Sequence, residues 1–111
     1  MYQTITHTNQ LDWAALDIAG VLIKVLYNNE ETGAMSVITK MEAGAIIPLH
    51  SHTLADETVY VLEGDFIEDE IHHTPGTVFF GKAGTQHGPH RTSNGCLLLT
   101  HFSRELDFVL P

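Results

Sequence analysis

From residue 21 onwards, short apolar runs alternate with turn residues, mainly Gly, Asn and Pro. The runs cover residues 21–27, 35–41, 46–49, 58–62, 66–71, 77–81, 96–102 and 107–110. Turn residues stand between them, as in the stretches 28–33, 74–76 and 94–95. Turn signals this closely spaced are typical of a small all-β sandwich or barrel, and we expect each run to form a strand.

The segment before the first run carries two conflicting patterns. Its apolar residues match a helical stripe: Leu11, Ala15, Ile18, Leu22 and Val25. However, Gly20 interrupts that stripe, and residues 21–25 are rich in β-branched side chains. We therefore predict a strand over 21–27 and an irregular N-terminal lead-in over residues 1–19, anchored by Trp13.

The length of 111 residues suits a single domain, 1–111, because no repeat or Pro/Ser linker divides the chain. Hydrophobic residues make up 43% of the sequence, which is enough for an ordinary packed core. A bound metal would therefore add stability to a domain that folds without it, unlike the metal of a zinc finger.

The charge balance argues against two classes of partner. Five Lys and Arg face 14 Asp and Glu, a net charge of −9, and the five basic residues are scattered. Nucleic acid and anionic membranes would both repel such a surface.

Cys96 is the only cysteine, and no apolar run reaches the ~18 residues of a membrane span. We expect a soluble protein of the reducing cytoplasm.

Four side chains have the spacing of a metal site. His50 and His52 stand two residues apart, so an extended segment directs both rings to one face. Glu57 follows at the start of the run 58–62 and can offer an oxygen from a neighbouring strand. His87 comes thirty residues after Glu57, so only the fold can bring it in. We predict that these four residues bind one divalent transition metal.

The donor set narrows the choice of metal. Three imidazoles and one carboxylate suit Fe(II), Mn, Ni, Cu or Zn, and we favour Fe(II), with Zn, Mn or Ni as alternatives. A divalent ion bound in this way keeps a charge of about +1, which favours water, an anion or a chelating substrate in the remaining positions.

These residues fall into a known motif. Gly44-x5-His50-x-His52-x4-Glu57-x6-Gly64 resembles the first motif of the cupin superfamily at every defining position. Gly76-x5-Lys82-x-Gly84-x2-His87 resembles the second motif, with Lys82 where the family usually has Pro and Arg91 where it has Asn. Both departures fall on turn-shaping positions, so they bear on the turns more than on the metal ligands.

A closer resemblance points to one branch. The segments 62–70, 74–76, 84–90 and 93–96 resemble the ChrR-type cupins. That branch of the RmlC-like cupins includes the zinc-binding domain of an anti-sigma factor and iron enzymes similar to 2,4′-dihydroxyacetophenone dioxygenase. The resemblance implies a small jelly-roll β-barrel of six to eight strands with the metal inside, in a homodimer.

The remaining histidines have less specific settings. His72 and His73, beside Glu68, Asp69 and Glu70, suit a charged edge strand better than a second metal site. Strand alternation sends His90 to the face opposite His87, which predicts a surface or dimer contact. His101 can equally line the cavity or lie in the second shell of the metal.

Two other side chains have ordinary structural interpretations. Cys96 precedes three leucines, which predicts an inert buried thiol. Arg91 can bind a substrate carboxylate, although a salt bridge at the rim is the commoner role for such a residue.

Two functions fit the same four ligands. The first is an Fe(II)-dependent dioxygenase acting on a small oxygenated substrate of the ketone or diketone type, with the metal centre itself as the catalyst. The second is a non-catalytic zinc cupin that senses a ligand or regulates a partner, because zinc accepts a closed four-ligand shell. Of these two functions, we expect the dioxygenase.

No serine or cysteine nucleophile motif, phosphate-binding Gly loop or Cys-x-x-Cys pair is present in the sequence.

Overall fold

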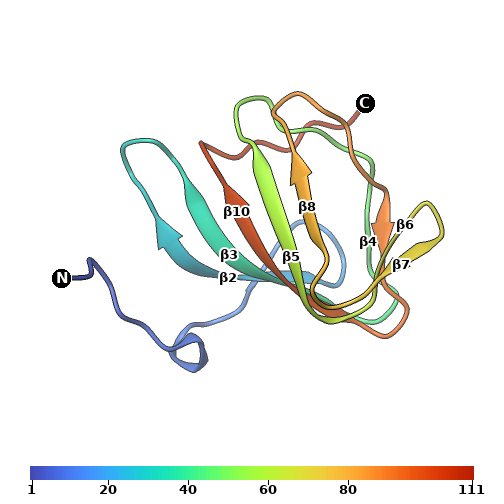
Figure 1. Cartoon of the computed structure of the whole chain (residues 1–111), viewed down its shortest axis with the longest axis horizontal. Coiled ribbons are helices and arrows are strands. Elements are labelled where there is room, and N and C mark those ends of the chain that lie inside the picture. Colours follow the sequence, from blue (N-terminus) through green and yellow to red (C-terminus); the bar gives the residue numbers. More distant parts are fainter.

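Two antiparallel sheets curve around a shared interior in the computed structural model, which describes residues 1–111 (Figure 1). The larger sheet has six strands in the order β1-β2-β3-β10-β5-β8. Their bounds are Ala14–Ala15 (β1), Val21–Asn28 (β2), Met35–Met41 (β3), Cys96–Phe102 (β10), Glu57–Gly64 (β5) and Val78–Gly81 (β8). The last long strand of the chain therefore lies in the middle of the sheet, between two strands from earlier in the sequence.

The smaller sheet closes the opposite side of the interior. Its four strands follow the order β4-β9-β6-β7. They span Ile46–Ile47 (β4), His90–Arg91 (β9), Phe66–Glu68 (β6) and Ile71–His73 (β7). One 3-10 turn, η1 (Thr8–Gln10), is the only helical element, and it is neither long nor apolar enough to cross a membrane. This architecture confirms the all-β class expected from the turn spacing and the jelly roll that the cupin resemblance implied.

The core lies between the two sheets, and strand alternation puts it there. Along β10 every second side chain points inward and is buried, as are the inward residues of β3 and β5. Phe66 brings the smaller sheet into the same cluster, where it packs with Val61 and Leu98. Each fully buried apolar side chain of this kind stabilises the fold by about 1.5–3 kcal/mol.

One motif glycine has a structural cause. Gly64 has a φ of +82°, and a Cβ on it would lie 2.0 Å from the carbonyl oxygen of Gly95. No side chain fits there, because β5 and the turn before β10 approach each other too closely. The last glycine of the first cupin motif is therefore a packing requirement of the large sheet.

Two predicted strands differ from the structure. The run 66–71 is a hairpin of β6 and β7, because Asp69 and Glu70 have φ values of 51° and 61°, as in a tight two-residue hairpin turn. The run 107–110 forms no strand; a single bridge joins Val109 to Ser51. The predicted irregular lead-in contains the short strand β1, and Lys24 and Lys40 lie over the ring of Trp13.

The core assignment predicts that two neighbouring truncations on β5 destabilise the fold to different extents. Val61 is fully buried, whereas Leu62 is 37% exposed on the other side of the strand. We expect Val61→Ala to lower the free energy of unfolding by about 2–3 kcal/mol, from lost burial and a residual cavity. Leu62→Ala removes more atoms but should cost less than about 1 kcal/mol. Urea denaturation measures both values, and a larger loss for Leu62→Ala would contradict the assignment of the core.

Candidate metal centre

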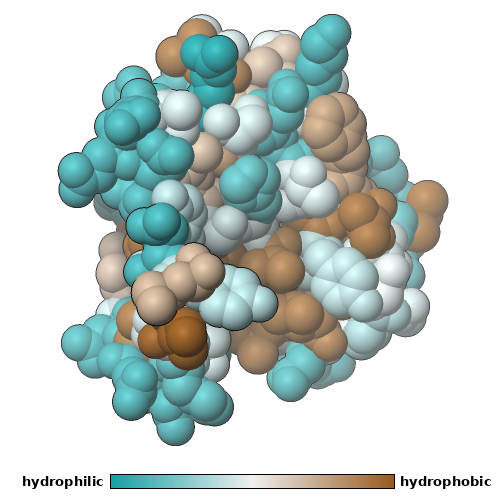
Figure 2. Space-filling view, turned by 60° about the vertical axis from the view of Figure 1, so that its left-hand side comes forward, coloured by the Kyte–Doolittle hydropathy of each residue, from teal (hydrophilic) through white to brown (hydrophobic).

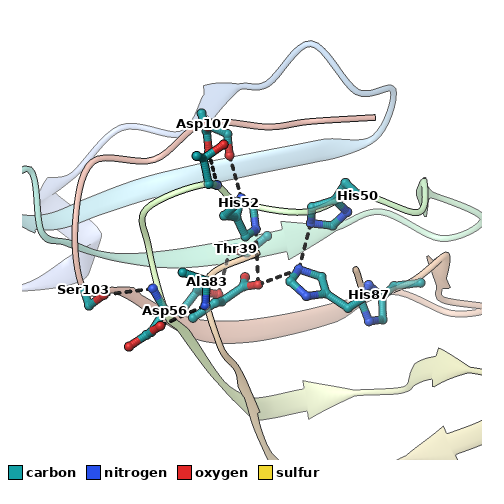
Figure 3. Close-up of polar contacts among 12 residues, drawn as sticks. Thr39, His50, His52, Asp56, Ala83, His87, Ser103 and Asp107 are labelled. Carbon is teal, nitrogen blue, oxygen red and sulfur yellow. Dashed lines mark hydrogen bonds and ion pairs between the residues drawn. The ribbon is translucent and has the colours of Figure 1, made fainter. Parts of the chain in front are cut away.

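The four residues of the predicted metal site meet at one place, although they come from three parts of the chain. His50 and His52 follow β4, Glu57 begins β5, and His87 pairs with His50 through an isolated bridge. The Nε2 atoms of His50 and His87 are 3.1 Å apart, and Glu57 Oε1 lies 3.0 Å from His87 Nε2 and 3.4 Å from His52 Nε2. Figure 3 shows the three imidazoles directed toward one another.

The spacing of these donor atoms fits one metal ion. Four potential ligand atoms, one from each residue, all lie within 4.8 Å of one another. Donors about 2.1 Å from a common ion are about 3.0 Å apart at neighbouring octahedral positions and about 3.4 Å apart around a tetrahedron. The observed short separations fall in that interval. His52 Nε2 is also the one buried side-chain nitrogen or oxygen without a hydrogen-bond partner, as expected of a nitrogen that ligates a metal.

Two backbone carbonyls determine which ring nitrogen is free to ligate. His50 Nδ1 lies 2.7 Å from the Pro48 carbonyl oxygen, and His52 Nδ1 lies 2.6 Å from that of Asp107. A carbonyl oxygen can only accept, so each Nδ1 carries the hydrogen and donates it. In the neutral ring the lone pair is then on Nε2, which points into the cluster. This is the outer-sphere arrangement that metal-binding histidines ordinarily have.

The electrostatics of the cluster centre on Glu57. Burial by itself would raise the pKa of Glu57, but the imidazoles of His52 and His87 outweigh burial and lower that pKa to about 2. Burial lowers the pKa of His50 to about 4, so its ring is neutral near pH 7. Burial also acts to lower the pKa of His52, yet Glu57 and the Asp107 carbonyl together raise it. The metal-free cluster thus contains an ionised carboxylate, and a metal ion would compete with a proton mainly at His52.

Contacts from two later segments hold the loop between His52 and Glu57. The backbone N–H of Gly84 donates to the His52 carbonyl at 2.7 Å, and that of Ala83 donates to Asp56 Oδ1 at 2.9 Å. The backbone N–H of Asp56 donates in turn to Ser103 Oγ at 2.8 Å (Figure 3). The loop is therefore tied to the turn after β8 and to the end of β10, which limits the positions that His52 and Glu57 can take.

The C-terminal segment Asp107–Val109 lies across the two histidines, and we call it the C-terminal strap. Asp107 accepts from His52 through its carbonyl and from the backbone N–H of Thr53 through Oδ1 at 2.7 Å. The ring of Phe108 stacks on His50 with centroids 4.3 Å apart and an interplanar angle of 19°. No sequence pattern indicated this role, because the strap and the histidines are more than fifty residues apart.

The cluster lies in the wall of a cavity of about 270 Å³ between the sheets. Fifteen of its 25 lining residues are hydrophobic, and Leu106 and Phe108 bring the C-terminal segment into the wall. Figure 2 shows apolar surface gathered in a recessed area of one face, surrounded by hydrophilic residues. A small molecule in the cavity would meet the donor cluster in a largely apolar environment.

The prediction that His90 lies on the opposite face from His87 is wrong. His90 is 8% exposed, lines the same cavity and contacts Glu68 through its Nε2. Strand alternation does not carry over from His87, because Gly88 between them has a φ of +95° and β9 begins only at His90. Glu68, which we assigned to a charged edge, also lines the cavity.

The other candidate side chains lie outside the site. His101 is exposed on the outer face and pairs with Ser36 Oγ at 2.8 Å, so it does not line the cavity. Arg91 forms the expected salt bridge, with Glu70 at 3.0 Å. Cys96 is buried, and burial raises the pKa of its thiol to about 11, which agrees with an inert packing role. His72 and His73 lie on the edge strand β7 and join no metal-binding cluster.

Comparison with known proteins places this architecture in a family. Residues 1–104 match the family model of the ChrR cupin-like domain. No curated protein matches the chain significantly. Among solved structures, KdgF from Halomonas sp. is 24% identical with a TM-score of 0.79, and the match covers 96% of this chain and 97% of that one.

Two further structures carry the name of one activity. A candidate acetylacetone dioxygenase from Methylibium petroleiphilum PM1 has a TM-score of 0.83 at 16% identity, over 100% of this chain and 83% of that one. An acetylacetone dioxygenase from Acinetobacter johnsonii has a TM-score of 0.75 at 13% identity, over 93% of this chain and 74% of that one. At these identities the likeness shows a shared fold.

The lowered pKa values predict that acid destabilises the metal-free protein in two steps. The unfolded His50 binds a proton near pH 6.5 but the folded one only near pH 4, so stability falls as the pH drops between these values, by up to about 3 kcal/mol. Glu57 contributes stability above pH 4.5 that is lost as the pH falls toward 2. His52, with its raised pKa, contributes in the opposite direction: its stability is present below pH 6.5 and is lost above it.

Denaturant unfolding of chelator-treated protein at a series of pH values measures this profile. His50→Gln should flatten the slope between pH 6.5 and 4 in part, because burial also lowers the pKa of His90. A wild-type stability that stays constant from pH 6.5 to 4 would show that His50 is not held neutral by the fold.

The C-terminal strap predicts an effect of Phe108 on metal affinity. Phe108→Ala removes the ring that orients His50, so we expect Co(II) or Zn(II) to bind about 10-fold more weakly. Leu110→Ala is the matched control, since Leu110 directly follows the strap, is 58% exposed and does not line the cavity. Competition titration with a chromophoric chelator gives both affinities. Equal affinities in the two variants and the wild type would remove any role of the ring in the site.

Proposed function

We propose that this chain, which belongs to the ChrR cupin-like family, is a metal-dependent dioxygenase that holds one Fe(II) through His50, His52, Glu57 and His87. Its substrate is a small ketone or diketone bound in the barrel cavity. The observation that carries the proposal is the position of four converging donor atoms in the wall of an apolar cavity, with the tautomers of His50 and His52 already selected by backbone carbonyls.

The chemistry of the donor set supports iron. Fe(II) prefers six positions, so four protein ligands leave neighbouring positions for a chelating substrate and for O₂. Fe(II) bound there would supply the electrons and the open positions that an oxygenation requires.

The protein's own residues perform the other tasks. The carbonyls of Pro48 and Asp107 hold the rings of His50 and His52 so that Nε2 faces the centre. Glu57 supplies the one negative charge of the cluster and can accept from His87 or ligate a metal. The apolar walls exclude water from the reacting groups, which strengthens electrostatic interactions in the site.

The size of the cavity supports a small substrate. A volume of about 270 Å³ lies at the lower limit of pockets that bind drug-sized ligands. The names of two structural neighbours, an acetylacetone dioxygenase and a candidate one, agree with a compact dicarbonyl compound as the substrate class.

A zinc-binding sensor is the competing function. The separation of 3.4 Å between His52 Nε2 and Glu57 Oε1 is also that of a tetrahedral shell, in which four protein ligands leave no open position. Such a centre would stabilise the fold or respond to a ligand without catalysis. The two functions differ in whether the ion can accept a further ligand.

Nitric oxide distinguishes the two functions, because it binds ferrous centres in place of O₂. We expect anaerobic Fe(II) protein, loaded to one ion per chain, to give the spin signal of an iron–nitrosyl, and a chelating diketone to alter that signal. Double replacement, His50→Ala with His52→Ala, should abolish iron binding, since it removes two of the four donors. Metal retained by the double variant would show that the assigned ligands are wrong. A fully loaded ferrous protein without a nitrosyl signal would leave the zinc module as the function.

A further inference from the structure

One polar pair lies in the cavity apart from the four donor residues. Glu68 ends β6 and His90 begins β9, two neighbouring strands of the smaller sheet, and Glu68 Oε1 contacts His90 Nε2. Apart from the donor cluster, these are the only titratable side chains among the residues that line the cavity. They form a carboxylate–imidazole pair in a mostly hydrophobic wall.

Burial makes this pair costly as a purely structural contact. His90 is 8% exposed, and its ring stacks on Phe66 with centroids 4.5 Å apart and an interplanar angle of 16°. Burying two ionisable groups usually stabilises a fold no more than an apolar pair of similar size would. Ionisable groups in a cleft with a specific partner are more typical of functional sites.

The hydrogen bonding of the pair leaves one basic nitrogen available. With Nε2 of His90 donating to Glu68, the lone pair of the neutral ring is on Nδ1, which forms no hydrogen bond within the protein. Nδ1 of His90 is not among the fully buried polar side-chain atoms without a partner, so this nitrogen is not completely enclosed by protein. A Cβ at position 88 would lie 3.3 Å from Nδ1, so glycine there leaves this nitrogen uncovered.

The position of His90 relative to the donor cluster suits a shared small ligand. Its ring centroid lies 6.1 Å from that of His87 and 6.5 Å from that of His50. His90 does not belong to the donor cluster. The ring of His90 therefore lies close enough to the donor cluster, in the same cavity, for one compact molecule to contact both.

This assignment rests on the proposed function: we propose that the Glu68–His90 pair is the general base of the cavity. The substrate is a carbon acid with a C–H between two carbonyl groups. In the step, that C–H bond breaks and its electron pair delocalises onto the two carbonyl oxygens, which forms an enolate. The proton moves to Nδ1 of His90, and Glu68 stabilises the resulting imidazolium. The step needs no oxidant, and it converts a neutral dicarbonyl into a bidentate anion.

The surrounding charges are compatible with this role. Burial lowers the pKa of His90, although Glu68 acts to raise it, and the lowered pKa favours the neutral ring that a base requires. The other charged groups that face the pair are His87 and Glu57 of the donor cluster. Arg91, which is next to His90 on β9, is engaged by Glu70 at the rim.

The test uses the full chain loaded with zinc, which has no redox chemistry and leaves the probe intact. Acetylacetone is the probe, and calorimetry in two buffers of different ionisation enthalpy counts the protons released on binding. We expect almost no proton release from the wild type, because the pair keeps the proton. His90→Phe, which retains a ring against Phe66, should release about one proton per acetylacetone.

Glu68→Gln provides a second variant in case His90→Phe folds poorly. We expect stopped-flow absorbance to show enolate formation slowed by about 10²-fold or more in both variants, with one zinc per chain retained. Glu70→Gln is the matched control, since it removes a carboxylate from the same hairpin that pairs with Arg91 at the rim, and it should behave as the wild type.

Three outcomes would overturn the proposal. In the first, both variants bind zinc fully but release as many protons and form the enolate as fast as the wild type does. The pair would then be only a structural link between β6 and β9. Another is one proton released from the wild type. The third is a zinc-loaded wild type that does not bind acetylacetone. Failure of the proposed dioxygenase is seen separately, as a missing iron–nitrosyl signal in the wild type.

Discussion

The hydrogen bond from His52 Nδ1 to the Asp107 carbonyl, at 2.6 Å, is the contact on which the rest of the site depends. It selects the tautomer that leaves Nε2 of His52 free, and that nitrogen is the one buried side-chain nitrogen or oxygen without a partner. Together with the Ser51–Val109 bridge, it holds the C-terminal strap in place, so that Phe108 covers His50. The strap thus couples the orientation of two potential metal ligands to the C-terminal segment.

Charge is the second constraint on the cluster. Three imidazoles within 4.8 Å of one another cannot all be protonated, and burial keeps His50 neutral. Glu57 provides the only negative charge among them, and its pKa of about 2 keeps that charge throughout the physiological range. The metal-free fold therefore already supplies an ionised carboxylate and a neutral His50, whereas the raised pKa of His52 favours a proton that a metal would displace.

The cavity combines two environments that suit different parts of one small ligand. Its apolar walls come from both sheets, whereas its ionisable groups are the four donor residues and the Glu68–His90 pair of the smaller sheet. A ligand with closely spaced oxygens and an acidic proton would meet the donor cluster and the ring of His90, whose centroid lies 6.1 Å from that of His87. This arrangement connects the proposed oxygenase chemistry to the proposed proton transfer.

The sequence by itself determined the all-β class, the strands 35–41 and 96–102, and the four residues that converge at the candidate metal centre. Strand periodicity and motif spacing are local properties, so the amino-acid order reveals them directly. The tertiary structure alone decided the roles of Glu68, His90 and the C-terminal strap. Gly88 breaks the alternation that would relate His90 to His87, and Asp107 meets His52 although the two residues are 55 positions apart in the sequence. Contacts of that kind depend on how the two sheets close around the cavity, which no local pattern encodes.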